Sequence, residues 1–265
     1  MHVGIVDPGD ANAVLSAIEE ENFSRPESSQ LKLSALLATH HHADHTGGIA
    51  QLVSAFPDLT VVGGTRDGIK YANMLVAEGD VVSVGQVQVS VLDTPCHTNG
   101  SVCFLINNQA LFTGDFLFAA GAGRFFEGNA KDMVTSLEKL NRLPNETLMF
   151  CGHEYTLSNL TFANRVLPNH IRIKERLDWA KTQRDDQRPT IPSSLGVERQ
   201  TNVFLMCQES ELSQRVKELC LARPSLVVGS GSDVGKDARI TSDSAAQSVF
   251  RVMAALRTLK DVGLQ

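Results

Sequence analysis

The chain has 265 residues, of which 42% are hydrophobic, which is enough for one large core or for a core domain with a smaller companion. Its formal net charge of −6 argues against nucleic acid or an anionic membrane surface as a partner, because both need clustered cations. No stretch reaches the roughly 20 apolar residues that cross a bilayer, and the first residues lack a basic segment followed by an apolar run, so we expect a soluble protein that is not exported.

The first elements are predicted to be a strand, a turn, a helix and a second strand. Residues 3–6 form a short apolar run, Asp7-Pro8-Gly9 has turn chemistry, and Asp10 can cap a helix. Residues 22–30 are polar and rich in turn formers, which predicts a surface loop. The next apolar run, residues 33–38, ends at a cluster of histidines.

The middle of the chain is predicted to be rich in strands, because short β-branched or apolar runs alternate there with turn residues. These runs are residues 59–62, 81–84, 87–92, 101–106, 110–112 and 147–151. Residues 133–140 have the spacing of a helix. The strand pattern stops after residue 151.

The last hundred residues are predicted to be helical. Helices are expected at residues 157–166, 171–181, 210–221 and 244–260, separated by segments such as 190–196 and 229–235. We therefore expect an α/β layered domain in residues 1–156 and a small α-helical domain in residues 157–265.

The segment from His40 to His45 carries the clearest chemistry. It offers His40, His42, Asp44 and His45 within six residues at the end of an apolar run. Imidazole and carboxylate are ligands of divalent metals, and alternation on an extended backbone points His40 and His42 the same way. Asp44 and His45 can then face a second ion. A histidine-rich surface loop or an adventitious metal binder is the alternative.

Three more ligand candidates follow other strands in turn-rich contexts. They are His97 in Thr94-Pro95-Cys96-His97-Thr98, Asp115 in Phe112-Thr113-Gly114-Asp115, and His153 in Cys151-Gly152-His153-Glu154. A single histidine is usually an ordinary surface or core residue. Ligand residues at four strand ends are what a site at one edge of a sheet requires.

Together these motifs resemble the metallo-β-lactamase fold superfamily, and more closely glyoxalase II, the hydroxyacylglutathione hydrolases. Gly123-Arg124-Phe125-Phe126-Glu127-Gly128 and Tyr155 after His153 extend the resemblance over nearly the whole chain. The resemblance implies an αββα sandwich with a small helical C-terminal domain. The strand hairpin that precedes the Val-Asp-Pro segment in the family is missing here, so we expect an exposed sheet edge and consider that a natural amino-terminal segment is absent.

By resemblance, two divalent metal ions occupy the site. His40, His42 and His97 hold one, Asp44, His45 and His153 hold the other, and Asp115 bridges them; His41 positions its neighbours. Asp44 and Asp115 are the catalytic carboxylates, with Asp44 acting as a ligand and not as an acid. Two metals lower the pKa of a shared water towards neutrality, and the hydroxide attacks a thioester. Histidine and carboxylate suit zinc, iron and manganese, and zinc is our expectation.

The resemblance also implies how a glutathione thioester is bound. Arg124, Phe126, His153 and Tyr155 stand at family contact positions, and Arg257-Thr258-Leu259-Lys260-Asp261 resembles a terminal motif whose cations pair with the glycine carboxylate of glutathione. On spacing alone, Arg257 and Lys260 indicate a solvated helix face. Phe126 departs from the family's tyrosine and loses a hydroxyl donor, which puts the thiol carrier in doubt.

The predicted reaction is hydrolysis of S-D-lactoylglutathione to D-lactate and glutathione, in methylglyoxal detoxification. One alternative is a glutathione persulfide dioxygenase of the same fold, with one iron on His40, His97 and Asp115. Others are a truncated relative without catalysis and a nuclease, against which the acidic charge counts.

The expected protein is a cytoplasmic monomer. Its five cysteines are odd in number and lack a C-x-x-C pair, which fits a reducing compartment. A mitochondrial location would follow if a natural amino-terminal segment is missing. No function is assigned to residues 22–30 or 208–236.

Overall fold

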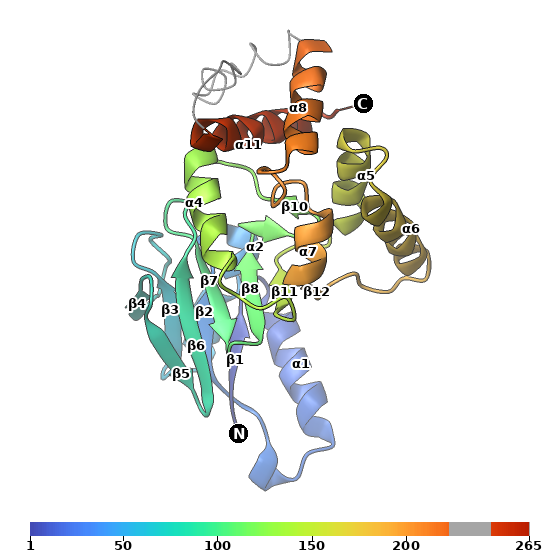
Figure 1. Ribbon diagram of the computed structural model, residues 1–265. Coiled ribbons are helices and arrows are strands. Elements are labelled where there is room, and N and C mark those ends of the chain that lie inside the picture. The colour runs from blue at the N-terminus through green and yellow to red at the C-terminus, as the bar shows by residue number, and fades with distance from the viewer. Residues whose placement is uncertain (223–244, 265) are drawn as a thin grey trace.

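The protein is described here by a computed structural model that covers residues 1–222 and 245–264. Two β-sheets face each other and helices cover both outer faces, which confirms the predicted αββα sandwich (Figure 1). Of the segments considered in the sequence, residues 229–235, the first residue of the last predicted helix and part of the segment 208–236 lie outside the described residues.

The first sheet has four parallel strands in chain order. They are β1 (His2–Val6), β2 (Lys32–Ala38), β3 (Thr60–Gly64) and β4 (Met74–Val76). Side chains alternate between the two faces of a strand. In β2, Leu36 and Ala38 therefore pack outward against α1 (Ala11–Phe23) and α3 (Ile49–Ala55), while Ala35 and Leu37 face the second sheet.

The second sheet has six strands and is mixed. Its order is β12 (Ser193–Ser194), β11 (Leu148–Cys151), β8 (Ala110–Gly114), β7 (Val102–Ile106), β6 (Val87–Asp93) and β5 (Val81–Val84). Only β8 and β11 run parallel to each other. Val89, Val91 and Phe104 of this sheet close the core between the sheets.

The outer face of the second sheet carries the largest hydrophobic core. Leu105, Leu111 and Met149 pack there against α4 (Ala130–Leu140) and the C-terminal helices. Those helices gather at one end of the sandwich (Figure 1). They are α5 (Thr156–Val166), α6 (Ile171–Asp185), α7 (Leu195–Thr201), α8 (Ser210–Ala222) and α11 (Ala245–Asp261).

Several short elements were not predicted, among them β4, β12 and α7. β4 is short, and the strand β12 and the helix α7 lie at the end of a segment that was expected to be only a linker. The prediction that the strand pattern ends at residue 151 is therefore wrong. The loop at residues 22–30 also contains a short 3-10 helix, Glu27–Ser29.

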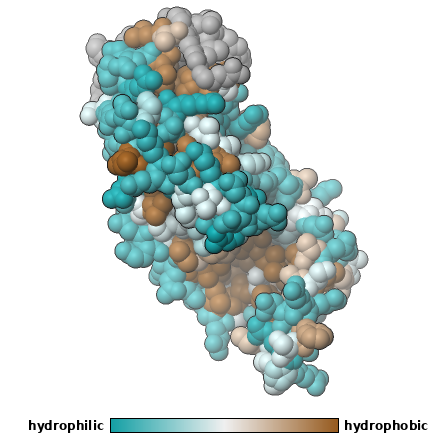
Figure 2. Space-filling model, turned by 90° about the vertical axis from the view of Figure 1, so that its right-hand side faces the viewer, coloured by the Kyte–Doolittle hydropathy of each residue, from teal (hydrophilic) through white to brown (hydrophobic). Residues whose placement is uncertain are grey.

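Strand β1 lies at an edge of its sheet. Apolar side chains gather in a hollow on one face of the molecule (Figure 2). Beside β1, a cavity of about 260 Å³ is lined by Val6, Phe112, Phe150 and Ile191 among others. No helix in the described part of the chain is long and apolar enough to cross a membrane.

Candidate metal centre

Three histidines form one ligand cluster. His40 and His42 follow β2 directly, and His97 lies in the loop after β6. The Nδ1 atom of His42 lies 3.1 Å from Nε2 of His40 and 3.0 Å from Nε2 of His97. A neutral imidazole carries only one N–H group, so Nδ1 of His42 cannot donate to both facing nitrogens. Three ring nitrogens that converge in this way suit a shared metal ion.

Asp44, His45 and His153 form a second cluster beside the first. Asp44 and His45 lie on α2 (Ala43–Thr46), which begins directly after His42, and His153 follows β11. Oδ2 of Asp44 lies 3.2 Å from Nε2 of His153 and 3.8 Å from Nε2 of His45.

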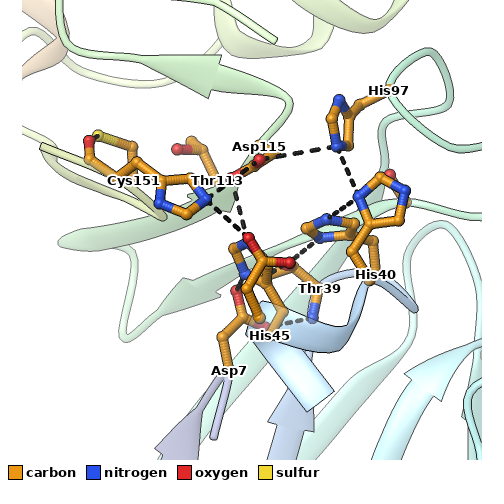
Figure 3. Close-up of polar contacts among 12 residues, drawn as sticks. Asp7, Thr39, His40, His45, His97, Thr113, Asp115 and Cys151 are labelled. Carbon is orange, nitrogen blue, oxygen red and sulfur yellow. Dashed lines mark hydrogen bonds and ion pairs between the residues drawn. The ribbon is translucent and has the colours of Figure 1, made fainter. Parts of the chain in front are cut away.

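Asp115 lies between the two clusters (Figure 3). Its Oδ2 atom lies 3.6 Å from Nε2 of His97 and 3.5 Å from Nε2 of His153, and its Oδ1 atom lies 3.3 Å from Nε2 of His45. The structure thus brings together all seven residues that the sequence predicted as ligands.

Two buried atoms in this centre have no hydrogen-bond partner, namely Nε2 of His45 and Oδ1 of Asp115. Such atoms are costly to bury unless a ligand binds them. Gly152 leaves room between them, because a Cβ atom there would lie 2.5 Å from Asp115 Oδ1 and 2.5 Å from His45 Cε1. The space and the imidazole and carboxylate donors fit divalent metal ions.

Contacts behind the rings fix which nitrogen of each histidine points inward. The carboxylate of Asp7 can only accept, so His45 donates from Nδ1 to Asp7 Oδ2 at 2.8 Å. Thr39 donates its hydroxyl to the same oxygen and can then accept from Nδ1 of His40 at 3.1 Å. His97 donates from Nδ1 to the carbonyl of Arg124. All three rings therefore turn Nε2 towards the centre.

The electrostatic environment differs between the rings. Burial, together with the neighbouring His45, His97, His42 and His41, lowers the pKa of His40, which keeps its ring neutral and ready to bind a metal. Burial also lowers the pKa of His97, against the opposing effect of Asp115. For His45, burial is outweighed by the carboxylates of Asp115 and Asp7, which raise its pKa to about 10.

Asp7 is a site residue that the sequence reasoning missed, since it was read only as part of a turn. It follows β1, which runs parallel to β2, so the ends of both strands meet at the same sheet edge. Its carboxylate accepts from the backbone and hydroxyl of Thr39 as well as from His45. Its backbone φ of +51° is unusual for a residue other than glycine.

A cavity of about 430 Å³ opens beside the metal centre, with His97 and Asp115 in its lining. Phe126 packs edge-on against the rings of His42 and His97, with ring centres 5.7 and 5.2 Å apart. Tyr155 stacks on His153 at 4.9 Å. The expected substrate-contact residues Arg124, Phe126, Tyr155, Arg257 and Lys260 all line this cavity.

The two cations of the last helix are not on a solvated face, so the interpretation from spacing alone is wrong. Arg257 is only 5% exposed, and its guanidinium donates to both carboxylate oxygens of Asp261 and to the carbonyl of Ala122. Lys260 donates to Asn159, and its Nζ lies 5.6 Å from the centre of the Phe162 ring. Burial and the nearby Arg257 lower the pKa of Lys260 to about 7.

The ring of His41 lies edge-on to that of His42, with ring centres 5.0 Å apart, and its polar contacts lie outside the two clusters. Its Nδ1 atom lies 3.3 Å from the buried carboxylate of Asp67, which also accepts from the hydroxyl of Thr98 at 2.6 Å. His41 lies between the ligands His40 and His42, and Thr98 follows the ligand His97. Asp67 therefore connects the two segments that carry the first cluster.

Two family descriptions together match almost the whole chain. The metallo-beta-lactamase superfamily matches residues 3–153, and the hydroxyacylglutathione hydrolase C-terminus matches residues 154–263. The hydroxyacylglutathione hydrolase of Erwinia tasmaniensis is 44% identical over 212 residues, which cover 80% of this chain and 81% of that protein. The cytoplasmic hydroxyacylglutathione hydrolase of Arabidopsis thaliana is 41% identical over 219 residues, which cover 80% and 82%.

Solved structures show the same fold. ETHE1 from Myxococcus xanthus is 29% identical with a TM-score of 0.55, over 84% of this chain and 81% of that one. TTHA1623, crystallised in a di-iron-bound form, is 27% identical with a TM-score of 0.51, over 75% and 87%. The chain therefore belongs to the metallo-β-lactamase superfamily and, within it, to the hydroxyacylglutathione hydrolase family.

Proposed function

We propose that this protein hydrolyses thioesters of glutathione, with S-D-lactoylglutathione as substrate and D-lactate and glutathione as products. One observation carries the proposal. Asp115 lies between two ligand clusters and lines a cavity that the cations Arg257 and Lys260 also line. A site of this kind combines metal-assisted hydrolysis with binding of an anionic carrier.

In this proposal, His40, His42 and His97 would hold one divalent ion and Asp44, His45 and His153 the other, with Asp115 against both. Such ions, when bound, lower the pKa of water towards 7 and supply hydroxide near neutral pH. The di-iron form of TTHA1623 supports two ions, and zinc is the metal we propose. Asp7 and Thr39 keep His45 and His40 turned towards the centre.

The cavity supplies the contacts for the carrier. Lys260, Arg124 and Arg257 offer positive charge to the carboxylates of glutathione, although Arg257 and Arg124 both also lie against Asp261, at 2.7 and 3.5 Å. Tyr155 can donate its hydroxyl beside His153, and Phe126 gives an apolar edge next to the first cluster. These contacts leave the thioester carbonyl next to the ligand clusters.

Hydrolysis then needs little acid catalysis from the protein. Hydroxide adds to the thioester carbonyl, and the carbon–sulfur bond breaks to release a thiolate. A thiol has a pKa of roughly 8.5, so its anion is a good leaving group without a proton donor. This agrees with a centre in which Asp44 and Asp115 serve as ligands.

Residues 1–156 would form the metal-binding domain and residues 157–265 the substrate-binding domain. The protein would act as a monomer in the cytoplasm, a location supported by the name of the Arabidopsis relative.

The dioxygenase alternative needs only His40, His97 and Asp115. It leaves the second cluster of Asp44, His45 and His153 without a role, although the ligand atoms of these residues also lie within 4.8 Å of one another. Oxygen uptake with glutathione persulfide and one iron per chain would support that alternative. A non-catalytic relative would bind glutathione normally and release no thiol from the thioester.

The test is thiol release from S-D-lactoylglutathione by the metal-loaded protein, before and after a chelator, together with Asp115→Asn. We expect the chelator to abolish turnover, added metal to restore it, and Asp115→Asn to lose it. Unchanged turnover with the chelator or in Asp115→Asn would contradict the proposal.

A further inference from the structure

A buried ion pair lies among the C-terminal helices, away from the metal ligands. Arg176 on α6 donates to Oε1 of Glu198 on α7 at 2.6 Å, and Glu198 is fully buried. Ser193 also donates its hydroxyl to Oε1 at 2.6 Å. A buried charge is stable only when it is paired and hydrogen-bonded, so these contacts by themselves could be purely structural. The carboxylate of Glu198 also contacts a segment outside the helices.

The other carboxylate oxygen of Glu198 reaches the turn between β9 (Leu117–Phe118) and β10 (Gly121–Ala122). Oε2 accepts from the backbone N–H of Ala120 at 2.7 Å and from the side-chain amide of Asn202 at 3.2 Å. Ala120 has a φ of +56°, a conformation that is uncommon for alanine. The buried carboxylate thus stabilises this turn.

Asn202 and Asn159 complete the contacts to the same turn. Asn202 donates to the carbonyls of Phe118 at 3.2 Å and Gly121 at 3.0 Å. Asn159 donates to the carbonyl of Ala119 at 2.9 Å. Backbone groups that a loop would normally expose to water are therefore bound by side chains of the C-terminal helical region.

Strand β9 begins two residues after Asp115, and the turn that follows it forms part of the cavity wall. Phe118 and Ala122 line the cavity, and Phe118 packs edge-on against Tyr155 at 5.2 Å. A little further along, the carbonyl of Arg124 accepts from Nδ1 of His97. A shift of the turn would therefore move both the aromatic wall and a contact behind a metal ligand.

We propose that Glu198, together with Asn202, is a positioning residue that sets the shape of the substrate cavity through the turn at residues 118–121. This inference rests on the proposed function, because the cavity is the one that binds the thioester. Arg176 and Ser193 act one step further away, by fixing the carboxylate of Glu198.

The test variant is Glu198→Gln, which keeps the size of the side chain. Its amide has one oxygen, so an NH₂ group must face either the N–H of Ala120 or the donors Arg176 and Ser193. We expect KM for S-D-lactoylglutathione to rise about fivefold or more, the effect of losing roughly one hydrogen bond. We expect kcat at saturating metal to stay near that of the unaltered protein.

The matched control is Arg199→Met on the same helix. Arg199 donates to the carbonyls of Leu140 and Leu143 and to Asn145, and none of these belongs to the turn. This variant should lower thermal stability without changing KM. An equal rise of KM in both variants would mean that α7 acts only through general stability and would overturn the inference.

A second readout does not depend on turnover. Hydrogen exchange of the backbone over residues 117–123 should become faster in Glu198→Gln and stay unchanged in Arg199→Met. If the unaltered protein hydrolyses no thioester, the proposed function fails, and the exchange result still decides the role of Glu198. Unchanged hydrogen exchange over residues 117–123 in Glu198→Gln would overturn the inference about Glu198.

Asn202→Ser provides the same test if Glu198→Gln cannot be obtained folded. It removes the amide that donates to the carbonyls of Phe118 and Gly121 and leaves the charge of the network intact. Faster exchange over residues 117–123 and a raised KM are expected. Exchange like that of the unaltered protein would overturn the inference.

Discussion

Oδ2 of Asp7 lies 2.8 Å from Nδ1 of His45 and holds that ring with its Nε2 atom towards the metal centre. Asp7→Asn keeps the shape but replaces one accepting oxygen by an NH₂ group. Loss of such a contact behind a metal ligand typically weakens metal binding roughly 10–100-fold, and we expect that range here. Competition with a chelating dye measures it.

Asp10→Ala is the control for Asp7→Asn. Asp10 caps α1 by accepting from the N–H groups of Asn12 and Ala13, so its loss should cost about 1 kcal/mol of stability and leave metal affinity unchanged. Metal affinity of Asp7→Asn equal to that of Asp10→Ala would show that Asp7 does not support the centre.

Gly152→Ala tests whether the space between the two clusters is needed. The added methyl group would lie 2.5 Å from both Asp115 Oδ1 and His45 Cε1, so these side chains must move apart. We expect loss of bound metal and of turnover, measured by elemental analysis and thiol release. Gly68→Ala is the control, because no atom lies within 4 Å of the added methyl group there, so that substitution strains only the backbone, whose φ is +66°.

Phe126→Tyr tests the departure from the family at the cavity mouth. Phe126 is 60% exposed and packs against His42 and His97, so a hydroxyl can be added without filling the core. One new hydrogen bond to the carrier would lower KM about five- to tenfold, the equivalent of roughly 1 kcal/mol. Phe126→Leu removes the ring without adding a donor, so a lower KM in that variant as well would contradict this explanation.

Lys260 makes substrate binding depend on pH. Burial and Arg257 lower its pKa to about 7, so the free protein loses this positive charge as the pH rises above 7. If the charge binds a carboxylate, KM should rise about tenfold between pH 7 and 9, because a charge-assisted hydrogen bond contributes roughly 1.5 kcal/mol or more. Lys260→Arg stays charged and should show a flatter KM profile; identical profiles would refute the assignment.

The lowered pKa of Lys260 also predicts that the protein becomes more stable as the pH rises, whereas substrate binding becomes weaker. Between pH 7 and the ordinary lysine value of 10.5, the unfolded chain binds more protons at this position than the folded one. Stability should therefore rise with pH across that window and lose this contribution as the pH falls towards 7. Lys260→Met should remove this part of the dependence, as measured by chemical unfolding.

The ligands could be predicted because the sequence places them where their geometry follows from simple rules. His40, His42, His97, Asp115 and His153 each follow an apolar run, and strand ends meet at a sheet edge. The same rule applied to β1 would have found Asp7. It was missed because Asp7-Pro8-Gly9 is a typical turn sequence, so the aspartate needed no further role.

The C-terminal region was less predictable, since its structure depends on buried polar contacts. Glu198 and Arg176 look like ordinary surface charges in the sequence, yet both are buried and connect α6 and α7 to the cavity wall. Helix α7 has only seven residues, too few to show a hydrophobic period. Arg257 likewise has the spacing of a solvated residue, and its burial follows only from packing against Phe204 and Asp261.

The most direct test of the two-metal account is titration of metal-free protein with zinc while D-lactate release from S-D-lactoylglutathione is measured. Because the two ligand clusters share Asp115, we predict that the rate rises until two equivalents per chain are bound and then stays constant. A rate that reaches its maximum at one equivalent, or no release of D-lactate at any metal content, would contradict it.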